Sequence, residues 1–392
     1  MHLFHTIKIM KIQFTMNQNN TMVINFSQIE IPTFTTPKAN GKGFIKFGKD
    51  NLWPQFLIEL AKHSSLHNAI LQSEVLYAYG AGLQPDSNSV ATLMWLNHPN
   101  PFETVNDIYK KCILDYCMFG GFALNIIWST DEKSISQVYH VDFSKLRCGE
   151  PDERGFVENF YFANDWTKSS EKGKLIKAYD PSKKKGSQIY YFKEYQPSSP
   201  VYPLPTYVGS LDWIAIDKEI SNFHLSHLIN GMSPNWAINF ANGIPTEEER
   251  RKIKQQIEDN YCGSDNSGKF ILTFCDNSEQ LPTFQNLSAD NLDEQFLQLQ
   301  NSVLQEILSG HRVVSPLLVG IKTEGQLGGA TELETAYAIY RATVIKPMQS
   351  RIVKVFNELL PYTPGYDGEE LSATEYKLDL NTENDGEQNL FD

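Results

Sequence analysis

The chain has 392 residues, of which 41% are hydrophobic and 12% aromatic, which is enough for two or three domain-sized units with packed cores. Its formal net charge of −13 argues against a protein that coats nucleic acid through a broad basic surface, because that affinity comes from Lys and Arg side chains that neutralise phosphates. The charge does not exclude a protein that lets DNA pass without gripping it. No apolar run approaches the roughly 20 residues of a membrane span, so we expect no membrane partner.

The first 49 residues are polar and rich in Lys, which predicts a flexible basic arm with a strand around 22–31. A helix is expected to begin after this arm, where Asp50 or Asn51 can cap it and Pro54 stands in its first turn. Its apolar spacing continues to the glycine-rich turn at 80–82. The pair Ser64-Ser65 is expected to divide this helix in two.

Short apolar runs separated by polar turns follow a second predicted helix at 101–118. Gly120-Gly121 turns the chain from this helix into the first run. We expect the runs to be strands, at 122–128, 137–143, 155–163, 175–178 and 188–194. Helices followed by short strands predict an α+β domain with an antiparallel sheet over residues 50–210.

Two amphipathic helices, at 211–230 and 289–310, enclose a small α/β segment. A Pro-rich linker at 197–205 precedes the first of these helices. The enclosed residues, 231–288, are predicted to form a strand, a charged helix and a second strand, at 236–240, 247–260 and 269–275.

Residues 311–361 combine an apolar segment (313–321), a loop of small and polar residues (322–330) and a long helix. Apolar side chains recur in this helix at every third or fourth position, which marks one helical stripe. Pro347 lies in the middle of the helix and removes a backbone hydrogen bond, so we expect a kink there. The acidic stretch 362–392 is predicted to be a solvated, disordered tail.

No stretch of the sequence predicts a catalytic, cofactor or metal site. The turn Gly263-Ser-Asp-Asn-Ser-Gly268-Lys269 has the spacing of a phosphate-binding loop, but Phe270 replaces the Ser or Thr that holds Mg²⁺, and a strand follows instead of a helix. Two histidine pairs of helical spacing lack an obvious third ligand, namely His63 with His67 and His224 with His227. The five cysteines form no Cys-x-x-Cys pair, which favours buried reduced thiols. We therefore expect that the protein is not an enzyme.

Three stretches make the chain resemble the portal proteins of tailed double-stranded DNA phages. The first begins at Asn51-Leu-Trp-Pro54 and ends at Leu76-Tyr-Ala-Tyr-Gly-Ala-Gly82-Leu83. The second, Gly310-His-Arg-Val-Val-Ser-Pro-Leu-Leu-Val-Gly320, is similar to the family's hrvPpxLlG segment. The third, Ile345-Lys-Pro347, is similar to the lxP kink in the family's long helix. The likeness covers residues 45–362, and the order of the motifs is more specific than any one of them.

The resemblance implies a portal-like division of the chain. Residues 50–210 would form the wing, 211–230 and 289–310 the stem helices, and 231–288 the clip. The loop would lie at the constriction of a DNA channel as a tunnel loop, and the kinked helix within 311–361 would return to the wing. Expected channel residues are Lys322, Thr323, Glu324, Gln326, Gly328 and Gly329. Expected docking residues of the clip are Asn242, Glu247, Arg250, Arg251 and Lys254.

The family forms homo-oligomeric rings, usually dodecamers, at one vertex of the phage head. The resemblance therefore implies four kinds of partner: the terminase large subunit, a head-tail adaptor, the major capsid or scaffolding protein, and double-stranded DNA bound without sequence specificity. It implies no cofactor, and it places the chain in the virion and, during assembly, in the host cytoplasm. Two alternatives stay open. One is a phage head enzyme or packaging ATPase, which the broken phosphate loop disfavours, and the other is a monomeric head-assembly adaptor.

Overall fold

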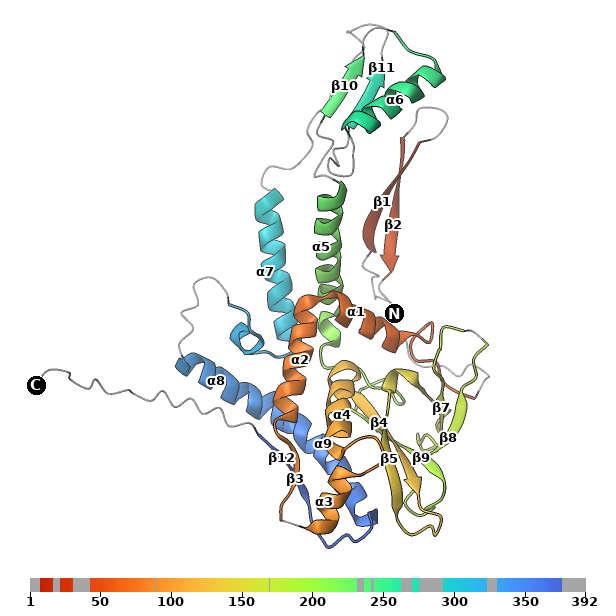
Figure 1. The fold of residues 1–392 in the computed structure, drawn as a ribbon, viewed down its shortest axis with the longest axis vertical. Coiled ribbons are helices and arrows are strands. Elements are labelled where there is room, and N and C mark those ends of the chain that lie inside the picture. The colour runs from red at the N-terminus through yellow and green to blue at the C-terminus, as the bar shows by residue number, and fades with distance from the viewer. Residues whose placement is uncertain are drawn as a thin grey trace, which may run out of the picture. The chain divides into compact units, whose positions relative to one another are not determined.

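The computed structural model describes residues 8–16, 22–30, 43–87, 89–168, 170–230, 236–240, 243–261, 270–274, 292–322 and 330–375. The chain divides into two compact units. The first unit combines Met1–Ser210 with Leu308–Asp392, and the second is Leu211–Ile307. Helices and antiparallel strands mix in the first unit, which confirms the α+β class predicted from the sequence (Figure 1).

The helical layer of the first unit begins with α1 (Trp53–His63) and α2 (Ser65–Tyr79). The predicted division at Ser64-Ser65 is confirmed, because the Ser64 hydroxyl accepts the His67 N–H at 3.1 Å and starts a new helix. The predicted cap of α1 is wrong. No side chain caps this helix, and the Asn51 Oδ1 instead accepts the Phe47 N–H at 3.0 Å and the Arg147 Nε at 2.6 Å.

Two further helices follow, α3 (Val90–Asn97) and α4 (Val105–Phe119). The sequence did not predict α3, and α4 begins four residues later than expected. The Asn100 side chain accepts the N–H groups of Phe102 and Glu103, so the chain turns there before the helix starts. A capping box between Thr104 and Asp107 then begins α4.

Six strands form one sheet in the order β5-β4-β9-β8-β7-β6. Their bounds are Gly121–Trp128 (β4), Ile135–Val141 (β5), Leu146–Cys148 (β6), Asn159–Phe162 (β7), Lys174–Ala178 (β8) and Ser187–Lys193 (β9). Neighbouring strands are antiparallel except β8 and β9, which run parallel through two residue pairs only. The expectation of an antiparallel sheet therefore holds except at this short junction.

The core of the first unit lies where α4 packs on the sheet and on α9 (Lys346–Leu359) (Figure 1). Tyr109 on α4 is fully buried and packs edge-to-face on Phe356 of α9, with ring centroids 5.9 Å apart. The sulfur of Cys117 on α4 lies 3.7 Å from the sulfur of Met348. These contacts tie the C-terminal helix to the N-terminal half of the chain.

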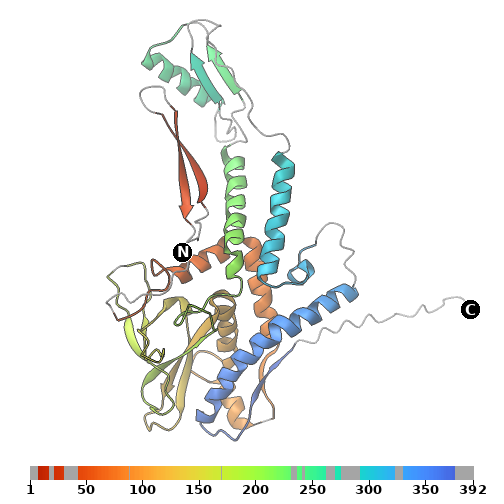
Figure 2. The same cartoon turned by 180° about the vertical axis from the view of Figure 1, so that it is seen from behind.

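The strand β3 (Gly82–Pro85) pairs with β12 (Leu371–Thr374) in an antiparallel ladder (Figure 2). The expectation of a disordered tail over 362–392 is wrong for β12. The Asn357 side chain bonds both backbone groups of Leu371, at 2.8 and 3.0 Å, and Leu371 is buried. Residues 376–392 lie outside the described chain. The predicted flexible arm also contains a strand pair, β1 (Lys8–Met16) with β2 (Met22–Glu30).

The second unit has the order helix, strand, helix, strand, helix. Its elements are α5 (Leu211–Asn230), β10 (Trp236–Phe240), α6 (Glu247–Tyr261), β11 (Phe270–Phe274) and α7 (Leu292–Gly310), whose last residues belong to the first unit. β10 and β11 are parallel, as a β-α-β connection through α6 requires. Among the described helices, none is long and apolar enough to cross a membrane.

The long helix of 331–360 consists of three segments. α8 (Ala330–Tyr340) passes into a π-helical turn, η5 (Arg341–Ile345), and this turn passes into α9. Within the turn the Lys346 N–H donates to the Arg341 carbonyl, five residues back. Pro347 stands at the start of α9, just after the turn. The regular α-helical ladder is therefore interrupted before the proline.

Candidate functional site: the chain after α7 and its long helix

Lys322 is the last described residue before the predicted loop, and its side chain is exposed. The other predicted loop residues, Thr323, Glu324, Gln326, Gly328 and Gly329, lie outside the described residues. The loop is therefore defined by its two flanks, which are the segment after α7 and the helix α8.

The predicted docking residues Glu247, Arg250 and Arg251 lie together in the first turns of α6, with exposed side chains. The Arg250 Nε donates to the Pro245 carbonyl at 2.9 Å, which holds this side chain at the start of the helix. Asn242 and the side chain of Lys254 lie outside the described part of the chain. The acidic first turn of α6 suits the positive end of the helix dipole.

The helix α7 ends in a hydrogen-bonded turn with Arg312 in the left-handed region, at φ 59°. The Arg312 N–H donates to the Ser309 carbonyl and the Val313 N–H to the Leu308 carbonyl, both at 2.9 Å. This pattern is a Schellman motif, in which the left-handed position is usually glycine. An arginine there costs about 1 kcal/mol or more of backbone strain.

The apolar segment after this turn forms η4 (Pro316–Val319), which ends at Gly320. Leu318 is buried, and its carbonyl accepts a hydrogen bond from the Tyr77 hydroxyl of α2 at 2.6 Å. The Tyr77 ring also contacts Tyr337 and Tyr340 of α8, with centroids 5.4 and 6.2 Å apart. Tyr77 therefore links the two flanks of the predicted loop.

A buried polar cluster lies beneath these flanks. His311 places its Nδ1 3.2 Å from the Glu74 carboxylate and its Nε2 2.8 Å from the Nδ1 of His67. The Tyr340 hydroxyl of α8 donates to the same carboxylate at 3.1 Å. Tyr207 stacks on the His311 ring with centroids 4.8 Å apart. The cluster joins α2, the end of α7 and α8 through groups that are fully or almost fully buried.

The His67 ring is uncharged in this cluster. Burial and the neighbouring His311 lower the pKa of His67 from 6.5 to about 3, so its ring carries no charge at neutral pH. Two hydrogen bonds explain the distances. One hydrogen bond joins the His67 Nδ1 to the His311 Nε2, and the His311 Nδ1–H donates to the Glu74 carboxylate. The His67 Nε2 is buried and has no hydrogen-bond partner among the described residues.

The π-helical turn is contacted from two directions. The Arg312 Nη2 donates to the Thr343 carbonyl at 3.0 Å. The Glu375 carboxylate, which follows β12, pairs with Arg341 at 2.5 Å and also with Lys346. Partial burial acts to raise the pKa of Glu375, but these two cations hold it below its usual value. The turn therefore lies between two electrostatic contacts.

Another buried acid-base pair lies between α4 and β5. The Asp115 Oδ2 is 2.7 Å from the His140 Nε2 and accepts the Phe143 N–H at 3.3 Å. Burial raises the pKa of Asp115 above its ordinary value. These partners make the pair a link between helix and sheet. Within the described ranges, no group of three or more His, Cys, Asp or Glu residues is arranged to hold a metal ion.

The described cysteines, Cys112, Cys117 and Cys148, are free and buried, as the sequence predicted. Cys262 and Cys275 lie outside the described chain. Burial raises the pKa of the Cys148 thiol to about 12, so this group is protonated at neutral pH.

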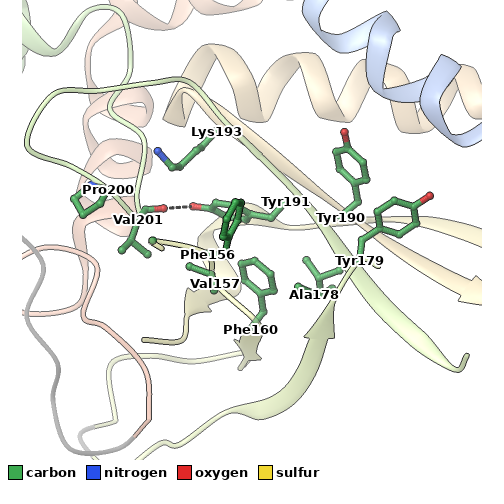
Figure 3. Close-up of a pocket in the computed structure, with 12 residues that line it drawn as sticks. Phe156, Val157, Phe160, Ala178, Tyr179, Tyr190, Tyr191, Lys193, Pro200 and Val201 are labelled. Atoms are coloured by element: carbon green, nitrogen blue, oxygen red, sulfur yellow. Dashed lines mark hydrogen bonds between the residues drawn. The ribbon is translucent and has the colours of Figure 1, made fainter. Parts of the chain in front are cut away.

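A pocket of about 290 Å³ opens beside the end of β9 (Figure 3). Phe156, Phe160 and Tyr191 line it, and the Tyr191 hydroxyl donates to the Val201 carbonyl at 3.2 Å. Lys193 supplies the single amine, and burial lowers the pKa of Lys193 below its usual value. The residues that line the pocket include no carboxylate and no imidazole. They offer packing surface rather than an acid-base constellation.

Sequence reasoning missed the buried cluster. Helical spacing pairs His67 with His63 in the sequence, but His63 is exposed and pairs with Glu59. The spacing on α2 did hold a signal, since His67 and Glu74 fall on the same helical face as Leu71 and are buried with it. Their partner His311 is 244 residues from His67, and no local pattern connects them.

Comparison with known proteins identifies the family of the chain. Residues 74–384 match the family described as phage portal protein. An uncharacterized protein of Rickettsia bellii (strain RML369-C) is 25% identical over 288 residues, which cover 71% of this chain and 69% of that protein. One of Rickettsia felis (strain ATCC VR-1525 / URRWXCal2) is 23% identical over 271 residues, covering 68% and 64%.

Solved structures share the fold. A chain from the neck of an empty gene transfer agent particle, computed with C6 symmetry, aligns with a TM-score of 0.54 at 16% identity and covers 84% of this chain and 86% of that chain. A chain from the virion of the native particle aligns with a TM-score of 0.51 at 16% identity, with the same coverage. At this identity the likeness concerns the fold.

Proposed function

Because the chain belongs to the phage portal protein family, we propose that its copies assemble into a ring that conducts double-stranded DNA at one vertex of a phage or prophage head. The family is one of structural proteins, and we assign no enzymatic reaction to the chain. The proposed subunit number is twelve, the usual number in the family. The proposed site of action is the virion, reached after assembly in the host cytoplasm.

In this proposal the predicted segments take family roles. Residues 50–210 are the wing, and the helices at 211–230 and 289–310 are the stem. Residues 231–288 are the clip, which docks the terminase large subunit during packaging and a head-tail adaptor afterwards. The exposed charges of α6 (Glu247, Arg250, Arg251) support docking through this face. The major capsid or scaffolding protein would contact the wing.

One observation carries the assignment of the loop at 322–330 to the channel. Both of its flanks are anchored in the first unit, by the Tyr77 hydrogen bond to Leu318 and by the Tyr340 hydrogen bond to Glu74. Such anchoring suits a loop that acts on passing DNA while its base stays fixed. The exposed Lys322 in an otherwise acidic protein suits weak, sequence-independent contact with phosphates.

Deletion of residues 323–329 tests the role of the loop. We expect the deletion variant to form the same ring as the wild type in negative-stain images, because the anchoring contacts of the flanks remain. We expect DNA packaging or retention in assembled heads to fall at least tenfold. Unchanged DNA content would refute the tunnel-loop role, and a wild-type chain that stays monomeric at micromolar concentration would refute the ring itself.

A further inference from the structure

We propose that Arg312 and Glu375 are positioning residues that hold the π-helical turn Arg341–Ile345. By holding this turn they fix the direction of α8 relative to α9. The proposal deepens the proposed function, since α8 carries the predicted tunnel loop. It depends on that function only for its consequence for DNA. The structural part stands on contacts within the first unit and can be tested separately.

The first support is the missing donor of Pro347. In a regular α-helix the Thr343 carbonyl would accept the N–H of residue 347, and a proline has none. The Arg312 guanidinium supplies a donor at that carbonyl, 3.0 Å away. A helix carbonyl that would lack its ladder partner therefore has a charged donor from a distant part of the chain.

The second support is the backbone of Arg312. It occupies the left-handed position of the Schellman motif at φ 59°, where glycine is the favoured residue. A strained non-glycine conformation persists when surrounding contacts over-determine it. The side chain of Arg312 gives such a contact. This conformation directs the chain so that His311 enters the buried cluster and Arg312 reaches the turn.

The third support is Glu375, which bridges the two ends of the turn. Arg341 is its first residue and Lys346 directly follows its last, and both pair with this one carboxylate. Straightening the turn into α-helix would rotate these two residues relative to each other, because the π-helical turn holds one residue more. Pairing of both cations with a single carboxylate therefore favours the π-helical geometry.

The neighbouring contacts fix the position of Arg312. His311 is held by Glu74 and His67, and Tyr340, the residue before the turn, bonds the same Glu74. Arg312 thus contacts η5 directly, and His311 is linked to the end of α8 through the Glu74 carboxylate that Tyr340 also bonds. A displacement of the end of α7 would therefore act on η5 through Arg312 and on the end of α8 through Glu74.

Replacement of Arg312 by glycine tests the proposal, because it removes the side chain and relieves the strain together. We expect Arg312→Gly to keep the wild-type melting temperature within a few degrees. We expect amide exchange in residues 339–348, measured by hydrogen–deuterium exchange on the full chain, to become about tenfold faster or more. Arg312→Lys, which keeps a cationic donor, should restore part of the protection, and Arg154→Gly at an exposed turn should change nothing in this segment.

Pro347→Ala gives the decisive control, because alanine returns the N–H that the Thr343 carbonyl would accept. In this background we expect Arg312→Gly to change exchange in 339–348 by less than threefold. Glu375→Gln should also speed exchange of this segment in the wild-type background. Two results would overturn the proposal. One is an undiminished effect of Arg312→Gly on exchange in the Pro347→Ala background, and the other is unchanged exchange in both Arg312→Gly and Glu375→Gln when each is made alone.

The consequence for DNA has its own readout. Arg312→Gly rings should assemble normally but package or retain less DNA than Arg312→Lys rings. Faster exchange together with normal DNA content would leave the positioning role intact and count against the tunnel-loop function. Normal exchange together with normal DNA content would overturn the positioning role alone.

Discussion

Arg147 is fully buried and donates to the backbone carbonyls of Asn51, Ser144 and Leu146, at 2.6 to 2.9 Å. Its guanidinium also lies 4.8 Å from the centre of the Trp166 ring. Burial lowers the pKa of Arg147 to about 10, which still leaves the group charged at neutral pH. At the scale of single residues, fixed carbonyl dipoles and an aromatic face thus stabilise a buried charge.

His67 presents the opposite case, a buried imidazole that stays neutral. Its pKa is about 3 in the folded chain and 6.5 in the unfolded chain, so the unfolded state binds more protons below pH 6.5. Stability from this group is therefore complete above pH 6.5 and is lost as the pH falls towards 3. The groups that face His67 are His311 and Tyr207, with Glu74 beyond His311.

We predict that lowering the pH from 7 to 5 destabilises the wild type more than His67→Asn. The expected difference is about 1.4 kcal/mol per pH unit at most, since one proton is involved. Urea unfolding followed by tryptophan fluorescence at both pH values measures it. His98→Asn, at an exposed position, should behave as the wild type does. Equal pH sensitivity in wild type and His67→Asn would contradict the neutral buried histidine.

At the scale of elements, the turn between α4 and β4 depends on close backbone approach. Gly120 ends α4 at φ 81°, in the left-handed region, and a Cβ there would lie 2.3 Å from the Leu204 carbonyl oxygen. The sequence predicted a glycine turn at this place. The packing of 203–204 against it became visible only in the fold, because those residues are distant along the chain.

We predict that Gly120→Ala destabilises the protein by about 3 kcal/mol or more, from backbone strain and a clash with a carbonyl that cannot move freely. Gly186→Ala is the matched control, since Gly186 has φ 67° and open space around the added Cβ. It should cost only about 1 kcal/mol. Urea unfolding midpoints of the two variants separate strain from clash, and similar losses in both would show that the close approach carries no cost.

At the scale of the whole molecule, the second unit exposes large apolar side chains on its long helices. Leu225 on α5 is 56% exposed and Leu297 on α7 is 60% exposed. Phe223 and Leu299 on the same helices are also exposed. A monomer that exposed these side chains to water would be prone to association, which supports burial between neighbouring copies of a ring.

We predict that the double variant Leu225→Asp, Leu297→Asp remains folded but forms no ring. Each buried leucine contributes about 1.5 to 3 kcal/mol to a contact, and an unpaired carboxylate in its place opposes burial. Size-exclusion chromatography with light scattering at micromolar concentration gives the mass. The control Asn222→Asp, Gln298→Glu adds the same two charges at exposed polar positions of the same helices and should keep the ring mass. Ring assembly by both double variants would exclude these leucines from the interface.

Local signals in the sequence specify the types and order of most elements, because helix and strand periodicities and glycine or proline signals act over a few residues. It predicted the division at Ser64-Ser65, the β-α-β segment of the second unit and the family. It missed α3, the π-helical turn and β12. The π-helical turn and β12 depend on contacts with distant parts of the chain, such as the pairing of β12 with β3, whereas the cap of α3 is the local Ser89 side chain.

The long-range partners of the polar side chains became known from the three-dimensional fold. His311 contacts His67 and Glu74, which are 244 and 237 residues away in the chain. Arg312 donates to the Thr343 carbonyl, for which Pro347 has no N–H. A sequence states that a proline removes a donor, but not which group replaces it. Hydrogen bonds and ion pairs are set by distance and angle in three dimensions, and chain neighbours do not encode them. The connection between the end of α7 and the turn in the long helix therefore belongs to the fold.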